Sequence, residues 1–326
     1  MKKRAPHQNL AFSHGVLIRF VVIALMSAAV MSMPVYAADN QLSEYVGANG
    51  YVEKWIVRDG FVANHILNAE KKVGEVVYIS TEGKLIFSYP FSGEEVLNVS
   101  ASQEDIYILF RKPTDTRKGK YYVGKYSVIR CSYAGKCAVE KIFAQGVFDI
   151  EAHAKGFFAV TYDFDAYRSV ETMTFPIISQ ILDISGLNER VVCCYPSGAP
   201  SALSYTINEG LFAMLDVVRE DSWFSEGVYK ITSDLSYERI PNYTPLKPRG
   251  KYDYPLFCQE FMISGNIFFC VDRYYDAQYR QINYKIYKIG RKQEFLGSYT
   301  SVAKPVVDSN GSVIILSPEF EFVKLE

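Results

Sequence analysis

Few side chains in this sequence have the types and spacing that catalysis requires. Two histidines follow the N-terminal segment, His65 and His153, and His153 belongs to a Glu-Ala-His alternation that is more typical of a structural histidine. No Gly-x-Ser-x-Gly elbow and no His-Glu-x-x-His motif occurs. Asp163 and Asp165 could offer two carboxylates to Ca²⁺, although aspartate pairs are common in solvated loops. The sequence therefore predicts no cofactor, with Ca²⁺ as a minor alternative, and it does not favour an enzyme.

Six cysteines are present, and their spacing favours local disulfides. Cys131 and Cys137 flank a short turn that contains Gly135, so we expect a bridge across a hairpin. Cys258 and Cys270 fall on two consecutive expected strands and form a second expected pair. For the adjacent Cys193 and Cys194, a vicinal bridge and two thiols are equally compatible with the sequence.

Aromatic residues alternate with charged residues in several polar segments, a composition typical of protein-binding surfaces. The segment from 111 to 120 is mainly basic, the segment from 216 to 226 mainly acidic, and the segment from 272 to 280 balanced. The candidate binding residues in these segments are Tyr121, Tyr122, Phe164, Tyr167, Trp223, Phe224, Tyr274, Tyr275 and Tyr279. The alternative without a binding function is that these segments are solvated loops whose aromatic rings cover the ends of the blades.

These segments lie between short apolar runs that recur at regular intervals. Each run follows a turn signal, and successive runs begin 45 to 56 residues apart. The six runs begin at Phe61, Ile106, Phe157, Leu211, Ile267 and Val313. A second type of run, apolar-x-apolar, follows each of them at Val77, Ile129, Leu182, Tyr229, Tyr287 and Val323. With a strand before and after these two, each unit is predicted to form four antiparallel strands, a to d.

The period and the strand content predict a β-propeller with six four-stranded blades. The sixth unit ends after its third strand, so we expect residues Gln41 to Val46 to supply its outer strand and close the ring. The chain resembles the six-bladed β-propellers of exported bacterial proteins, and the resemblance rests on periodicity rather than on a family signature. A β-sandwich and a seven-bladed propeller are the competing interpretations. The b–c and d–a connections of a propeller share one face, where long loops would form a binding surface.

The first 37 residues resemble a secretory signal peptide. A basic start precedes a 12-residue apolar run from Phe20 to Met31, and small residues follow at Val35-Tyr36-Ala37. The predicted domains are therefore a signal peptide, 1–37, and one propeller, 38–326. We expect a periplasmic or secreted protein without an integral membrane segment after cleavage. Charge is nearly balanced, with 35 basic and 36 acidic residues, which argues against a nucleic-acid partner.

Three functions follow as hypotheses. The favoured one is an exported binding or scaffold protein that holds a protein partner on the loop-rich face. The first alternative is a propeller hydrolase that acts on a lactone or a glycan through a metal in the central channel. The second alternative is a carbohydrate-binding module, which the presence of only two tryptophans weakens.

Overall fold

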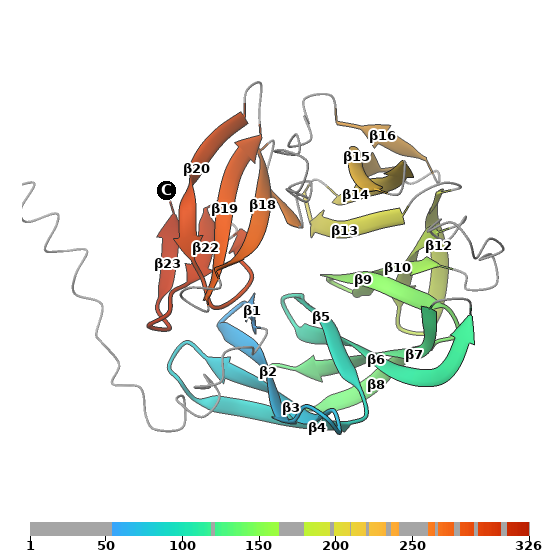
Figure 1. Ribbon diagram of the computed structural model, residues 1–326, viewed down its shortest axis with the longest axis vertical. Helices are drawn as coiled ribbons and strands as arrows, with labels where there is room; N and C mark the ends of the chain where they lie inside the picture. The colour runs from blue at the N-terminus through green and yellow to red at the C-terminus, as the bar shows by residue number, and fades with distance from the viewer. Residues whose placement is uncertain are drawn as a thin grey trace, which may run out of the picture.

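The chain folds into a β-propeller, which confirms the predicted fold class (Figure 1). The computed structural model describes residues 54–118, 121–162, 179–195, 199–208, 210–219, 222–232, 236–240, 260–264, 267–276, 281–289, 293–307 and 312–325. Within these ranges every element is a β-strand, and the strands form five four-stranded sheets and one three-stranded sheet. Each sheet follows chain order, so each expected unit is one antiparallel meander.

The first three blades match the predicted units. Blade one consists of β1 (Lys54–Val57), β2 (Gly60–Asn68), β3 (Val73–Ser80) and β4 (Leu85–Ser92). Blade two consists of β5 (Glu95–Ala101), β6 (Asp105–Lys118), β7 (Tyr121–Ser132) and β8 (Cys137–Phe143). Blade three consists of β9 (Gly146–His153), β10 (Gly156–Tyr162), β11 (Ser179–Ser185) and β12 (Asn188–Tyr195).

The remaining three blades complete the ring. Blade four consists of β13 (Ala199–Thr206), β14 (Gly210–Arg219), β15 (Ser222–Ile231) and β16 (Tyr237–Arg239). Blade five consists of β17 (Glu260–Ser264), β18 (Ile267–Asp276), β19 (Gln281–Ile289) and β20 (Gln293–Thr300). Blade six consists of β21 (Val306–Val307), β22 (Val313–Leu316) and β23 (Phe322–Leu325). The predicted fourth strand of this blade, Gln41–Val46, lies outside the described residues.

The core consists of apolar layers between neighbouring blades rather than one central cluster. Strand b of each blade has neighbouring blades on both sides, which explains why its sequence is a continuous apolar run. On β6, Ile106 and Ile108 pack toward blade one, whereas Tyr107 and Leu109 pack toward blade three. A chain of this length can therefore bury a large apolar area without a single thick core.

The first and last blades contact each other and close the ring. Trp55 forms a parallel bridge with Lys304, and the backbone N–H of Lys304 donates to the carbonyl of Lys54 at 3.0 Å. Ile56 and Phe61 of blade one share an apolar cluster with Leu316 of blade six. Closure in the described residues is thus made by packing and by one backbone contact at the inner strands.

The cysteine predictions have different outcomes. A disulfide joins Cys131 to Cys137 at opposite positions of β7 and β8, as predicted. Cys193 and Cys194 remain thiols, the first buried and the second exposed, so the vicinal bridge does not form. Cys258 lies outside the described residues, and its pairing with Cys270 remains a prediction.

Removing the disulfide is expected to destabilise blade two. A cross-link over six residues lowers the entropy of the unfolded chain, and its loss should cost about 2 kcal/mol of unfolding free energy. Urea denaturation of a Cys131→Ala/Cys137→Ala variant measures this loss, with Cys194→Ala as the exposed-thiol control. Equal stability of wild type with and without a reductant would contradict the expectation.

Candidate binding face and central axis

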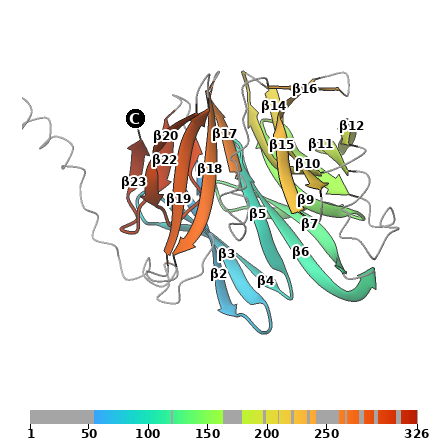
Figure 2. The same cartoon turned by 45° about the horizontal axis from the view of Figure 1, so that its top comes forward.

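Within the described residues, a two-stranded ribbon extends from the face that carries the b–c connections. β5 pairs with β6 only as far as Arg111, and β8 pairs with β7 only as far as Tyr126. Beyond these residues, β6 and β7 pair with each other alone, out to Lys118 and Tyr121. We call residues 112–118 and 121–125 the ribbon. In Figures 1 and 2 the far end of this hairpin, in teal, reaches past the rest of its blade.

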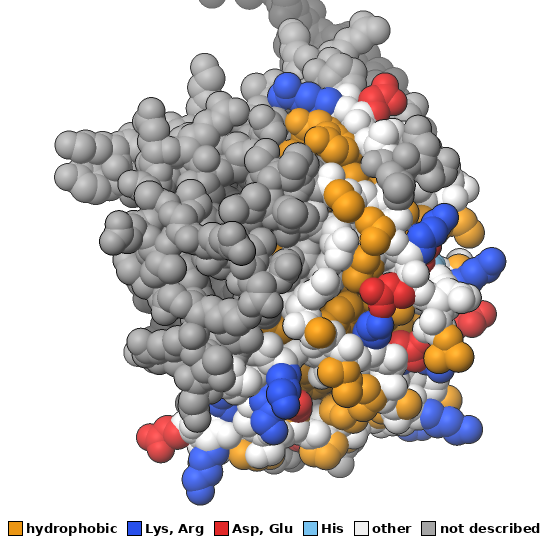
Figure 3. All heavy atoms as spheres, turned by 90° about the vertical axis from the view of Figure 1, so that its right-hand side faces the viewer, with side chains coloured by type: hydrophobic (Ala, Val, Ile, Leu, Met, Phe, Trp, Pro, Cys, Tyr) orange, Lys and Arg blue, Asp and Glu red, His pale blue; other side chains and the backbone are white. Residues whose placement is uncertain are grey.

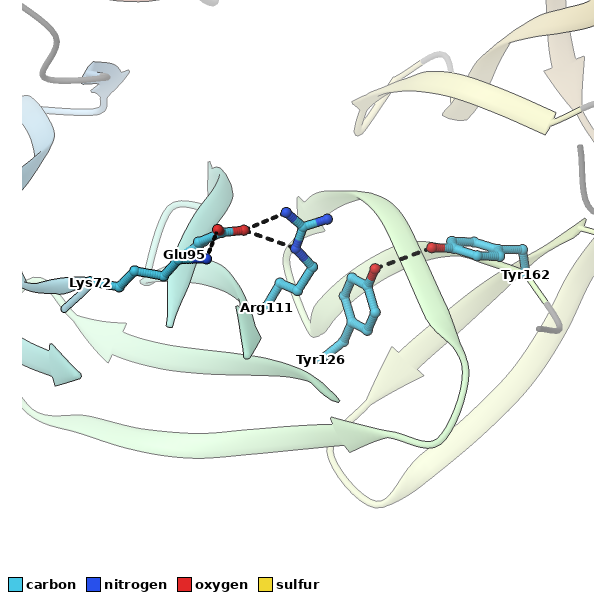
Figure 4. Close-up of polar contacts among 5 residues, drawn as sticks. All are labelled: Lys72, Glu95, Arg111, Tyr126 and Tyr162. Carbon is cyan, nitrogen blue, oxygen red and sulfur yellow. Dashed lines mark hydrogen bonds and ion pairs between the residues drawn. The ribbon is translucent and has the colours of Figure 1, made fainter. Parts of the chain in front are cut away.

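The ribbon starts from an ion-pair cluster that joins blades one and two (Figure 4). The Nε and Nη2 atoms of Arg111 both donate to Oε2 of Glu95, with Nε at 2.9 Å. The ammonium of Lys72, in the β2–β3 turn, donates to the other oxygen of the same carboxylate. Burial alone would raise the pKa of Glu95, but these two cations outweigh it and hold the pKa below its ordinary value.

A second contact at the base of the ribbon joins blades two and three. The hydroxyl groups of Tyr126 and Tyr162 lie 3.1 Å apart, within hydrogen-bond distance. The ring of Tyr162 stacks on Phe148, with centroids 4.1 Å apart. It also lies so close to Gly146 that a Cβ there would be 2.1 Å from a ring atom, which explains the glycine. Side chains from three blades therefore fix the direction in which the ribbon leaves the sheet.

The structure corrects the expectation that the b–c connections are long loops. Apart from residues 163–178, which lie outside the described residues, most of their length is paired strand. Gaps of a few residues separate β6 from β7, β14 from β15, and β18 from β19. The charges of these polar segments favour loops, but the segments also alternate aromatic and β-branched residues that pair well across two strands.

Six of the nine predicted binding residues have a described backbone, and all six lie near b–c ends of strands. Tyr121 and Tyr122 begin β7, opposite Lys118 and Arg117. The others lie in β15 and β18: Trp223 and Phe224 are opposite Val218 and Val217, and Tyr274 and Tyr275 are opposite Asn283 and Ile282. Phe164, Tyr167 and Tyr279 lie outside the described residues. The backbone thus places the six on one face but in three different blades.

Polar side chains on the innermost strands connect neighbouring blades near the axis. From β5, Ser100 Oγ accepts the N–H of Ala152 at 2.8 Å, and Asn98 Nδ2 donates to the carbonyl of Ile150 at 3.3 Å. Both bonds satisfy backbone groups on the inner edge of β9. The opposite edge of β9 pairs with β10.

Blade three contacts the innermost strand of blade four in the same way, but through carboxylates. From β9, Asp149 accepts the N–H of Leu203 at 2.9 Å, and Glu151 accepts the N–H of Tyr205 at 3.2 Å. Each carboxylate also accepts a bond from blade two, Asp149 from Asn98 and Glu151 from Ser100. Their oxygens are thus used to join blades two, three and four.

These carboxylates are energetically costly when ionised. Burial raises the pKa of Asp149 to about 6 and that of Glu151 to about 7, while the positive charge of Lys304 opposes both shifts. Across the ring, burial lowers the pKa of Lys54 to about 8. Among the described residues no group of three potential metal ligands occurs, and the suggested Ca²⁺ pair, Asp163 and Asp165, lies outside them.

His65 and His153 each contact residues of their own blade. His153 Nδ1 accepts the N–H of Lys155 at 3.2 Å, and its Nε2 lies 3.2 Å from Asp183 Oδ1. His65 Nδ1 lies 3.0 Å from Glu75 Oε1, its cross-strand neighbour. Burial lowers the pKa of His153, with Asp183 opposing the shift.

Sequence reasoning missed the ion-pair cluster and the axial pairs. Arg111 was identified as a basic residue of a b–c segment, but its partner Glu95 and the cation Lys72 were not. A signal for the axial pairs was present, since Asn98-x-Ser100 and Asp149-x-Glu151 recur 51 residues apart with polar residues on alternate positions.

Another surface carries exposed apolar side chains. Val139 and Ile142 on β8, Leu187 in the β11–β12 turn and Ile207 after β13 are all well exposed. Figure 3, which views the right-hand side of Figure 1, shows hydrophobic side chains in a strip with charged groups along it. Leu187 and Ile207 lie in c–d and a–b turns, on the face opposite the b–c connections.

Comparison with known proteins finds only distant structural likenesses. No family model and no curated protein matches the sequence. Puromycin hydrolase has a TM-score of 0.45 at 9% identity over 88% of this chain and 52% of its own. The apocarotenoid oxygenase of Synechocystis (Glu150Gln mutant) has a TM-score of 0.42 at 8% identity, over 74% of this chain and 60% of its own. A luciferin-regenerating enzyme has a TM-score of 0.42 at 10% identity, over 76% of this chain and 80% of its own. This chain thus spans about half of the first protein and 60% of the second, and likeness at this level assigns no activity.

Proposed function

We propose that this protein is an exported binding or scaffold protein, and that the face with the b–c connections holds a protein partner. The observation that carries the proposal is the ribbon, a paired extension that leaves the sheet from a base fixed by three blades. Rigid scaffolds with elaborated connections on one face are the usual form of binding surfaces. The aromatic residues that the backbone places along the same face are of the types that dominate protein interfaces.

Export is supported by two independent features. The N-terminal segment has the charge and apolar pattern of a signal peptide, and the disulfide between Cys131 and Cys137 is of the kind that forms in oxidising compartments. In the described part of the chain no helix is long and apolar enough to cross a membrane.

A test of the proposal compares two faces of the same molecule. The affinity-tagged protein is purified from periplasm of the source organism, and co-purifying proteins are quantified for wild type and for Trp223→Ala/Tyr274→Ala/Tyr275→Ala. We expect a near-stoichiometric partner that this variant loses. Titration of the purified partner should show at least tenfold weaker binding, because truncated aromatic anchors each cost about 1–3 kcal/mol.

The matched control is Leu187→Ser/Ile207→Ser, which changes exposed apolar residues in the turns of the opposite face. It should retain the partner at wild-type affinity. Loss of the partner in this control with retention in the aromatic variant would overturn the choice of face.

A further inference from the structure

The ribbon has little structural support of its own. Among the described strands, residues 112–118 and 121–125 pair only with each other, and Pro113 together with a shift of register interrupts the pairing. A two-stranded β-hairpin in water is marginally stable at best. The arrangement is therefore one that an additional contact would stabilise.

The ribbon concentrates positive charge in a chain that is otherwise nearly balanced. Between positions 112 and 125 the sequence has one acidic residue, Asp115, and five basic ones: Lys112, Arg117, Lys118, Lys120 and Lys125. Over the whole chain, 35 basic residues face 36 acidic ones. A local excess of this size attracts acidic groups and speeds encounter with them.

Two of these lysines occupy directly opposite positions of the ladder. Lys112 on β6 pairs with Lys125 on β7, and both side chains are exposed. Like charges at directly opposite positions destabilise a pair of strands. An acidic group bound between or beside the two ammonium groups would remove this repulsion, so the pair stabilises a complex at the expense of the isolated ribbon.

The base of the ribbon adds to the positive side. Arg111 and Lys72 share the carboxylate of Glu95, so two cations meet one anion there. Their side chains are between a third and two-fifths exposed, which leaves N–H groups accessible to a second carboxylate. The positive surface thus continues from the ribbon to Arg111 and Lys72. Beyond them, Glu70 and Glu94 supply negative charge at the rim of blade one.

We infer that the ribbon docks an acidic segment of the protein partner, with Lys112 and Lys125 as its central contacts. This inference rests on the proposed function and specifies its partner. A protein segment fits better than nucleic acid or an anionic membrane, because the β14–β15 hairpin on the same face is acidic. Its sequence contains Asp216, Glu220, Asp221 and Glu226. An extended polyanion would be repelled there, whereas a folded partner can present acidic and basic groups separately.

The experiment measures binding of a fluorescein-labelled peptide, eight glutamates separated by glycines, by fluorescence anisotropy in 50 mM and 300 mM NaCl. We expect wild type to bind at low salt and to lose most of this affinity at high salt. Lys112→Gln/Lys125→Gln should bind at least tenfold more weakly. The control Lys136→Gln/Lys155→Gln removes the same charge from exposed turns of the opposite face and should change affinity less than twofold.

A second variant separates recognition from damage to the ribbon. Lys112→Glu places opposite charges across the ladder, which should stabilise the hairpin, and it still removes positive charge from the binding surface. It should remain folded and monomeric by circular dichroism and light scattering while losing the peptide. Wild-type peptide affinity in this variant would overturn the inference.

Three further outcomes also count against the inference. The first is that the opposite-face control weakens peptide binding as much as Lys112→Gln/Lys125→Gln does. The second is that a 20-nucleotide thymidine oligomer or phosphatidylglycerol vesicles bind at least as tightly as the peptide. The third is that the peptide does not bind at low salt. Partner capture that persists in Lys112→Gln/Lys125→Gln would refute the ribbon's role but leave the proposed face intact. Capture that depends instead on Leu187 and Ile207 would refute the face itself.

Discussion

At pH 8, Glu151→Gln is expected to unfold at a higher urea concentration than wild type. Its carboxylate is partly buried near the axis and accepts hydrogen bonds from Ser100 and from the N–H of Tyr205. A glutamine amide can keep accepting from Tyr205 and can donate to Ser100, so the substitution removes the charge and preserves the contacts between blades. Burial raises the pKa of Glu151 from 4.5 to about 7, so the ionised form is the costly one.

The sign of the pH dependence follows from proton binding. Between pH 4.5 and pH 7 the folded state binds more protons at Glu151 than the unfolded state does, so wild-type stability falls as the pH rises through this window. Asp149, raised from 3.8 to about 6, acts in the same direction. At about 1.4 kcal/mol per pKa unit, and with a discount for remaining water contact, the gain from Glu151→Gln at pH 8 should be about 2 kcal/mol.

Urea denaturation at pH 5 and pH 8 tests this expectation. The advantage of Glu151→Gln should be present in full at pH 8 and should shrink to about a quarter of that value at pH 5. Glu104→Gln, an exposed carboxylate in the β5–β6 turn, is the matched control and should not differ from wild type at either pH. A variant less stable than wild type at pH 8 would show that attraction to Lys304 outweighs the cost of burial.

Replacing Gly156 by alanine should cost about 3 kcal/mol of unfolding free energy. Gly156 begins β10 directly after the a–b turn, where a Cβ would lie 1.9 Å from the carbonyl oxygen of Ile184 on strand c. Gly60 begins β2 at the equivalent position of blade one, and a Cβ there would lie 2.0 Å from the carbonyl oxygen of Ile79. Because the obstacle is backbone in both cases, a side-chain rotation cannot relieve the clash.

Thermal and urea unfolding of Gly156→Ala and Gly60→Ala measure this cost. Lys155→Ala, one residue earlier in the exposed turn, should leave stability within about 0.5 kcal/mol of wild type. Similar losses in both glycine variants would support equivalent blades. Wild-type stability in either one would contradict the close approach of strands b and c at that position.

The sequence was sufficient for the blade plan because that plan depends on local patterns. The apolar runs at Ile106 and Phe157 reflect a strand enclosed between two neighbouring blades, and Gly135 between Cys131 and Cys137 indicates a tight turn. These signals lie within one strand or one hairpin, so a single sequence carries them.

Features that depend on the relative position of blades could not be read in the same way. The bond from Asp149 to Leu203 joins residues 54 positions apart, and the bond from Asn98 to Ile150 joins residues 52 apart. Neither is implied by the composition of its own strand. The extent of pairing between β6 and β7 was also missed, because charged residues such as Lys112 and Lys125 are as common in loops as on exposed ribbons.

The central claim is that the partner lies against the b–c face, and cross-linking from single positions tests it most directly. A photo-reactive benzoylphenylalanine is introduced at position 122, 223 or 274 on this face, or at position 187 or 207 on the opposite face, and the cells are irradiated. We predict one shared cross-linked product from the first three positions and none from the last two. The same product from 187 and 207, with none from 122, 223 and 274, would contradict the account.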